Sequence, residues 1–128
     1  MGEKEFYYKE LSYRIRGAFF QVYNTLGPGQ KEVVYHNALT HEFKLSNIQF
    51  DINKKFAVKY KGGVVGFYQP DFIVDNKVIV EIKAIPNLIR LNELQVFYYI
   101  RNMEQKLAFL VNFGAEKLEI KRIVKKTE

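Results

Sequence analysis

The chain has 128 residues, of which 48% are hydrophobic, a composition that excludes a disordered protein and predicts a single packed domain over residues 1–128. It contains no cysteine, which excludes a disulfide framework and a thiolate zinc site, and no apolar run approaches the roughly 20 residues of a membrane span. The net charge of +6 suits a phosphate-rich partner such as a nucleic acid, and a charged start that is unlike a signal peptide favours a cytoplasmic location.

Two helices are predicted first along the chain. Apolar residues recur at helical spacing from about Glu5 to Leu26, and Gly27-Pro28-Gly29 ends this segment. A second helix is predicted from about Lys31 to Ser46, in which Glu32 and Tyr35 are i,i+3 neighbours that can face the same space. A simpler explanation of Glu32 stays open, because the helix dipole alone favours an acidic residue in the first turn.

A three-stranded meander is predicted next. Its strands are expected from Phe50 to Tyr60, from Val64 to Val74 and from Val78 to Ala84, where β-branched and aromatic residues dominate. The segment Asp75-Asn76-Lys77 is a turn signal between the last two strands. Pro70 cannot donate a hydrogen bond to a ladder, so we expect a sheet edge or a bulge at that position.

The length of this turn decides which side chains meet. If residues 75–77 form a three-residue loop, Val74 pairs with Val78 and Asp71 falls directly opposite Glu81. Directly opposed residues share a face, with Cβ atoms about 4.5–5.5 Å apart. Lys83 lies on the same face, because strand side chains repeat every two residues. A two-residue loop would shift the register by one and send Asp71 to the other face.

Two close carboxylates call for a cation or a proton between them. Oxygen ligands favour a hard cation such as Mg²⁺, or Mn²⁺, held by Asp71 and Glu81, with Lys83 stabilising charge on a phosphate. The only histidines, His36 and His41, are expected on a helix surface without a role. An ordinary cross-strand ion pair explains the same three charged residues, and the residues alone leave that alternative open.

The rest of the chain predicts one more helix and two strands. The helix runs from about Leu88 to Met103 and carries Gln95 and Tyr99 on one stripe. Gln95 can equally be a solvent-facing residue and Tyr99 a core aromatic. The segment 107–113 predicts a buried strand, parallel to an earlier one because a helix intervenes. A last strand at 118–124 is expected at the sheet edge.

An ordered set of motifs resembles a known family. Gly29, Glu32 and Tyr35 form Gly-x-x-Glu-x-x-Tyr, and Asp71, Glu81-Ile82-Lys83, Gln95 and Val111-Asn112-Phe113-Gly114 follow in order. Together they resemble the GxxExxY protein family, which is grouped with the PD-(D/E)XK nuclease superfamily of restriction endonucleases and junction resolvases. The chain departs from that family at Gln69-Pro70, where Arg-Ala is usual, and at Asn92-Glu93-Leu94-Gln95, where His-Glu-Ala-Gln is usual.

This resemblance implies a metal site and a fold. Asp71 and Glu81 look like the acidic ligands, the main-chain carbonyl of Ile82 like a third ligand, and Lys83 like the motif lysine. Glu32 resembles the helical acidic residue that some members add. Gln95 and Tyr99 resemble a Gln-x-x-x-Tyr element of exonuclease-like branches, and Tyr35 is expected near the site. The implied fold is a mixed α/β (α+β) restriction-endonuclease-like αβββαβ core, with a central mixed sheet flanked by helices.

The leading prediction is a Mg²⁺- or Mn²⁺-dependent nuclease that hydrolyses phosphodiester bonds in DNA or RNA. Its catalytic residues would be Asp71, Glu81, Lys83 and Gln95. One alternative is a catalytically inactive nucleic-acid-binding module on the same fold. Another is a protein-interaction module that self-associates, for example as a homodimer, through exposed aromatic residues.

Overall fold

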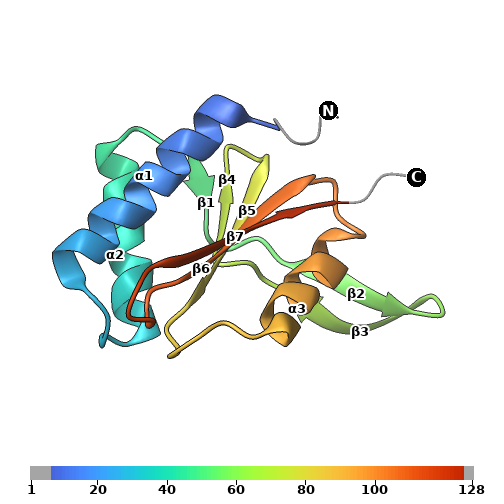
Figure 1. The fold of residues 1–128 in the computed structure, drawn as a ribbon. Helices are drawn as coiled ribbons and strands as arrows, with labels where there is room; N and C mark the ends of the chain where they lie inside the picture. The colour runs from blue at the N-terminus through green and yellow to red at the C-terminus, as the bar shows by residue number, and fades with distance from the viewer. Residues whose placement is uncertain (1–6, 126–128) are drawn as a thin grey trace.

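The computed structural model describes residues 7–125, which form three helices and seven strands (Figure 1). The helices are α1 (Lys9–Leu26), α2 (Glu32–Leu45) and α3 (Arg90–Ile100). The strands are β1 (Phe50–Asp51), β2 (Phe56–Tyr60), β3 (Gly63–Tyr68), β4 (Phe72–Val74), β5 (Val78–Lys83), β6 (Leu107–Asn112) and β7 (Glu119–Val124). The predicted helices are each present, α2 and α3 being shorter than expected at both ends. Residues 5 and 6, where the first helix was predicted to begin, lie outside the described residues.

The central sheet has five strands in the order β1-β4-β5-β6-β7. Strands β5 and β6 are parallel and are connected through α3, whereas the other neighbouring pairs are antiparallel. The predicted parallel crossover and the predicted edge position of the last strand are therefore confirmed. Strand β6 is buried along its whole length, as expected for a strand covered on both faces. The mixed α+β class is confirmed, and this arrangement is consistent with a restriction-endonuclease-like fold.

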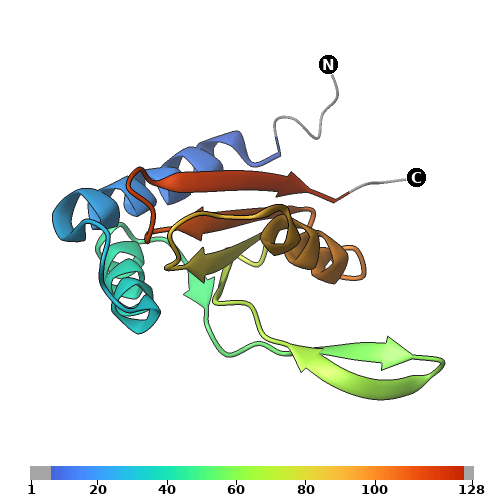
Figure 2. The ribbon, with the colours of Figure 1, turned by 60° about the horizontal axis from the view of Figure 1, so that its bottom comes forward.

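Helices cover both faces of the sheet (Figures 1 and 2). Helices α1 and α2 pack on one face, against a cluster that includes Phe72 and Val80. Helix α3 packs on the other face, where Val96 contacts a cluster that includes Ile73 and Ile79. Because alternate strand residues point to opposite faces, the odd-numbered residues of β4 and β5 are directed to the α3 side.

The predicted three-stranded meander is present in its strand order but is interrupted. Strands β1, β4 and β5, which lie in the three predicted segments, are neighbouring antiparallel strands of the central sheet. Strands β2 and β3 form a separate two-stranded sheet, the hairpin arm, which extends away from the central sheet (Figure 2). The predicted strand 64–74 is broken between Tyr68 and Phe72, and the predicted strand 50–60 is broken between Asp51 and Phe56. Pro70 explains the first break, since it lacks an N–H and its ring fixes φ, so the ladder cannot continue through it. The expected edge or bulge at Pro70 is instead the junction between the arm and the central sheet.

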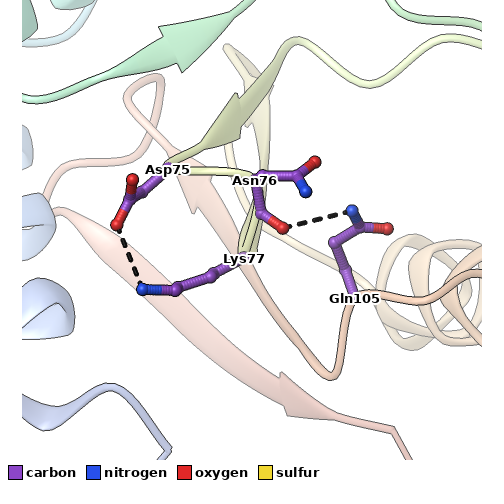
Figure 3. A network of polar contacts seen from close by, with 4 residues as sticks. All are labelled: Asp75, Asn76, Lys77 and Gln105. Carbon is purple, nitrogen blue, oxygen red and sulfur yellow. Dashed lines mark hydrogen bonds and ion pairs between the residues drawn. The ribbon is translucent and has the colours of Figure 1, made fainter.

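The turn between β4 and β5 has three residues, as one of the two predicted registers requires. Val74 pairs with Val78, and Lys77 N–H donates to the Val74 carbonyl at 2.9 Å. Asp75 and Asn76 have φ of 51° and 55°, a left-handed conformation that these two residue types tolerate. Lys77 Nζ lies 3.3 Å from Asp75 Oδ2, and Gln105 Nε2 donates to the Asn76 carbonyl at 3.4 Å (Figure 3). These contacts hold the turn from both sides.

Candidate functional site

Asp71 and Glu81 are linked by hydrogen bonds through the main chain. The Asp71 N–H donates to Glu81 Oε1 at 2.8 Å, and the Ile82 N–H donates to Asp71 Oδ2 at 2.8 Å. Both acidic residues are partly buried. One oxygen of each carboxylate is thereby oriented by a backbone N–H.

The three-residue turn brings this pair together. Its register pairs Ile73 with Ile79 and Phe72 with Val80, and one further step places Asp71 beside Glu81. Ile79 belongs to the cluster under α3, so Glu81 and Lys83, at the same parity in β5, are directed to that side. Asp71 immediately precedes β4, where pairing stops, and its side chain takes the place of a ladder partner for the Ile82 N–H.

The Glu81 carboxyl is strongly perturbed. Burial, followed by the neighbouring Asp71 charge, raises the pKa of Glu81 from 4.5 to about 8. The hydrogen bond from the Asp71 backbone and the charge of Lys83 act in the opposite direction but do not cancel the rise. A carboxyl in this position holds a proton at neutral pH unless another positive charge is supplied.

Lys83 supplies part of the positive charge at the site. Its ammonium lowers the pKa of both Glu81 and Glu32, so it lies within electrostatic reach of both carboxyls. Ile82 lies between Glu81 and Lys83 in β5 and directs its N–H to Asp71. The N–H and C=O of one strand residue point to the same side, so the Ile82 carbonyl is directed to the Asp71 side of β5 as well.

Glu32 approaches the pair from the opposite layer of the fold. It is the first residue of α2, and its pKa is raised by partial desolvation and then by the charge of Asp71. His36, one turn further along α2, lowers the pKa of Glu32. His36 is also half-buried and stacks on Phe72, with ring centroids 4.6 Å apart. The expectation that His36 is a surface residue is wrong, because Phe72 draws the imidazole inward next to the acidic residues.

Tyr68 is a site residue that the sequence did not single out. It is the last residue of β3 and only 6% exposed, and burial, followed by the charges of Glu81 and Asp71, raises the pKa of its hydroxyl. The hydroxyl lies beside the Glu81 carboxyl, yet it has no hydrogen-bond partner of good geometry among the described residues. A buried, unpartnered donor that faces a carboxylate is uncommon in folded proteins. The sequence did not distinguish Tyr68 from a packing residue, because it lies within the apolar strand pattern of residues 64–74.

The remaining predicted site residues lie at different distances from the pair. Tyr35 is fully buried and stacks on Phe113 at 4.8 Å, and its hydroxyl donates to the Gly27 carbonyl at 2.5 Å. It therefore holds the loop that precedes Glu32. Tyr99 stacks on Tyr68 with ring centroids 3.9 Å apart and so packs behind the pair. Gln95 is on the exposed side of α3 and forms no hydrogen bond to the pair within residues 7–125.

Residues 9–123 match the family model of the PD-(D/E)XK nuclease superfamily. The chain belongs to this superfamily. No curated protein and no solved structure matches the chain. PD-(D/E)XK nucleases generally use divalent metal ions, and membership implies a nucleic-acid substrate.

As a PD-(D/E)XK nuclease-superfamily protein, this chain offers two carboxylates and a main-chain carbonyl as hard oxygen ligands at one place. Within the described part of the chain, no group of three or more His, Asp or Glu side chains is arranged to hold a metal ion. The donor set fits a hard cation that keeps several waters, as Mg²⁺ does, better than an all-protein cage. In the same residues, no helix is long and apolar enough to cross a membrane.

The last motif of this PD-(D/E)XK chain has a structural role. The fully buried Asn112 accepts hydrogen bonds from the Ile85 and Gly114 N–H groups, each at 3.0 Å. Its Nδ2 donates to the Ile85 carbonyl at 2.9 Å and to Glu119 Oε1 at 2.8 Å. Glu119 in turn accepts from the Leu88 N–H at 2.8 Å. Asn112 therefore fixes the loop that leads from Lys83 into α3.

Proposed function

We propose that this protein is a metal-dependent nuclease that hydrolyses phosphodiester bonds in DNA or RNA. The observation that carries the proposal is the Asp71–Glu81 pair, two carboxylates oriented by the backbone with Lys83 in electrostatic reach. A surface ion-pair cluster does not require such an arrangement, because burying a carboxyl beside a second carboxylate, as in Glu81 with its raised pKa, is costly without a function. The superfamily supplies the reaction class.

Asp71, Glu81 and the Ile82 carbonyl would hold Mg²⁺ or Mn²⁺. Glu32, which does not form a three-carboxylate cluster with the pair, would complete the shell through one of the ion's water molecules. Each carboxylate keeps one oxygen free of the main chain, and the raised pKa values of Glu81 and Glu32 indicate a place that lacks positive charge. When bound, such an ion polarises the phosphodiester and lowers the pKa of a water molecule. Glu81 must lose its proton to act as a ligand, which couples metal binding to pH.

The other residues would bind and orient the substrate. Lys83 would place its ammonium against the phosphate and stabilise the negative charge that develops there. Gln95, exposed on α3, would orient water or phosphate, and Tyr35 and Tyr99 would hold the surrounding elements in position.

We further propose that residues 1–128 act as one nuclease-like domain of the GxxExxY family. The Gly29, Glu32 and Tyr35 motif supports the family, since Tyr35 secures the loop next to Glu32. A cytoplasmic location and a homodimer are further predictions of the sequence.

Calorimetric titration of Mn²⁺ into the wild-type protein and into Asp71→Asn/Glu81→Gln tests the metal site. Binding that is lost in the double variant is expected. Cleavage of single-stranded and duplex DNA and RNA should then require Mg²⁺ or Mn²⁺ and should fall strongly in Lys83→Ala. The matched control is Lys117→Ala, which removes an exposed lysine from the loop before β7 and should keep full activity. No metal binding by wild type, even with an oligonucleotide present, would contradict the proposal.

The second candidate, an inactive nucleic-acid-binding module, is favoured by one observation. The hairpin arm and its flanks, residues 52–70, contain Lys54, Lys55, Lys59 and Lys61 and no acidic residue. This function predicts binding that is independent of metal and weakens steeply with ionic strength. Full retention of nucleic-acid affinity together with no cleavage under any metal condition would favour it over the enzyme.

A further inference from the structure

A groove of about 510 Å³ separates the hairpin arm from α3. Four aromatic rings, one valine and one lysine form much of its wall: Phe56, Val58, Lys59, Tyr68, Tyr98 and Tyr99. Its volume lies within the range of about 300–1,000 Å³ that is usual for small-ligand sites. Figure 1 shows α3 lying beside the arm on the same side of the molecule.

Tyr68 lies between the groove and the candidate site. Its ring lines the groove and its buried hydroxyl lies beside the Glu81 carboxyl, so one side chain borders both. Tyr99 stacks on Tyr68 with an interplanar angle of 3°, which makes a flat double ring at this border. A ligand in the groove is therefore separated from Glu81 by one tyrosine.

Lys59 adds a positive charge to the groove. The register of the arm shifts between Val58 and Lys59, because Val65 of β3 is an extra residue without a partner in β2. Such a bulge bends the strand that carries it and increases the local twist. Four consecutive residues of β2, from Phe56 to Lys59, line the groove, so the groove runs along this strand and Lys59 lies at its wall.

Several aromatic rings in the groove remain open to a ligand. Tyr98 is 54% exposed and Tyr99 is 39% exposed, although both are large apolar side chains. The guanidinium of Arg101 lies 5.3 Å from the Tyr98 ring, which places a second positive charge beside the groove. Asn102 adds an amide that can both donate and accept hydrogen bonds.

We propose that this groove binds unpaired bases of a nucleic-acid strand whose backbone passes the Asp71–Glu81 site. Flat rings stack on bases, and Lys59 and Arg101 neutralise the neighbouring phosphates, a combination typical of sites for single strands. An acidic partner protein would use the positive charges but would not need a stack of flat rings. The substrate class is therefore a single-stranded or locally unpaired nucleic acid. This inference rests on the proposed nuclease for the identity of the ligand, but the test of binding does not depend on cleavage.

Fluorescence anisotropy with a labelled single-stranded oligonucleotide, as DNA and as RNA of one sequence, tests the groove in EDTA. Wild type should bind the single strands more tightly than the blunt duplex. Tyr98→Ala should weaken single-strand binding by about fivefold to a hundredfold, the loss that removal of one stacking ring causes. Tyr60→Ala removes a comparably exposed tyrosine of β2 that does not line the groove, and it should leave the affinity near that of wild type.

Lys59→Ala and Lys61→Ala form a second matched pair, because each removes one positive charge from the arm. Lys59→Ala should reduce affinity and lower the slope of log K against log salt by about 0.7, as loss of one phosphate contact to a single strand does. Lys61→Ala should have a smaller effect, since Lys61 lies over the Tyr60 ring outside the groove. A 2-aminopurine base in the oligonucleotide should be quenched by wild type and less so by Tyr98→Ala.

Three results would each overturn the proposal that this groove binds single strands. They are equal losses of affinity in the groove variants and their controls, a preference for the duplex, and no binding by wild type. The double variant Asp71→Asn/Glu81→Gln separates this proposal from the nuclease. If that variant and wild type both bind through the groove but wild type does not cleave, only the nuclease proposal is contradicted. If Tyr98→Ala and Lys59→Ala bind single strands as tightly as wild type and keep its metal-dependent cleavage, only the groove proposal is contradicted.

Discussion

The backbone N–H of Asp71 donates a 2.8 Å hydrogen bond to Glu81 Oε1, so the two acidic residues are joined directly by the protein. The Ile82 N–H completes the arrangement by donating to Asp71 Oδ2 at 2.8 Å. The carboxylates are thus held close despite their mutual repulsion, which contributes to the raised pKa of Glu81. The proposed metal site would therefore depend on pH, because Glu81 must lose its proton before it can act as a ligand.

Glu81→Gln should change how stability depends on pH. In metal-free wild type, Glu81 keeps its proton up to about pH 8 when folded, against an ordinary value of 4.5. Between these values the folded state binds more protons than the unfolded state, so the free energy of unfolding falls as pH rises. Gln mimics the protonated acid, so the variant should be more stable than wild type at pH 8 and above. The raised pKa of Glu32 also makes the free energy of unfolding fall as pH rises, and the Glu81→Gln variant retains this smaller dependence.

Urea unfolding at a series of pH values in EDTA checks this prediction. Glu116→Gln is the matched control, since Glu116 is exposed in the loop before β7, and it should follow the wild-type profile. If Glu81→Gln and wild type lose stability in parallel between pH 5 and pH 8, Glu81 is ionised throughout and the assignment is wrong.

Removal of the Tyr35 hydroxyl and removal of the Tyr68 hydroxyl should affect the free energy of unfolding differently. The Tyr35 hydroxyl donates to the Gly27 carbonyl and accepts from the Gln30 N–H at 3.1 Å, so Tyr35→Phe should lower the free energy of unfolding by about 1–3 kcal/mol. The Tyr68 hydroxyl is buried without a good partner, so Tyr68→Phe should be neutral or slightly stabilising. Both rings keep their stacking contacts. Urea midpoints of the two variants at one pH make the comparison, and an equal loss in Tyr68→Phe would show that its hydroxyl is bonded to Glu81.

Asn112→Ala should be strongly destabilising. The substitution removes the partners of the Ile85 N–H, the Ile85 carbonyl and the Gly114 N–H, and it leaves polar groups unsatisfied in a partly buried loop. A loss of roughly 3 kcal/mol in the free energy of unfolding follows. Asn24→Ala removes an exposed asparagine from α1 and should be near neutral. Chemical denaturation measures both, and similar stabilities for the two variants would contradict the assigned role of Asn112.

Gly114→Ala and Gly17→Ala should change stability in opposite directions. A Cβ at Gly114 would lie 2.5 Å from the carbonyl carbon of Ala84 and would also collide with Ile85, so the loop after Lys83 must shift. We expect a loss of about 1–3 kcal/mol, which is the usual effect of overpacking, together with reduced nuclease activity. A Cβ at Gly17 meets nothing within 4 Å and lies in the middle of α1, so alanine should stabilise by about 0.5–1 kcal/mol. Thermal unfolding of both variants provides the check, and a stabilised Gly114→Ala would refute the close approach.

Much of the fold and half of the site followed from local patterns. The turn chemistry of Asp75 and Asn76 set the β4–β5 register, and the register brought Asp71 to Glu81, because a three-residue loop leaves only one pairing. The helices, the parallel crossover and the edge strand followed from hydrophobic periodicity and chain order. These features depend on neighbours in the sequence, and such neighbours are visible without a structure.

Other features depend on contacts between distant residues, and only the tertiary structure decided them. The detachment of the hairpin arm at Pro70, the approach of Tyr68 and His36 to the acidic residues, and the network around Asn112 each join separate elements. The unpaired residue Val65 shifts the β2–β3 register between Val58 and Lys59, and no local pattern in the sequence marks it. The amino-acid sequence therefore determined the Asp71–Glu81 pair and the superfamily. The packing of α3 against the arm determined what surrounds the pair, because that environment is assembled from segments far apart in the chain.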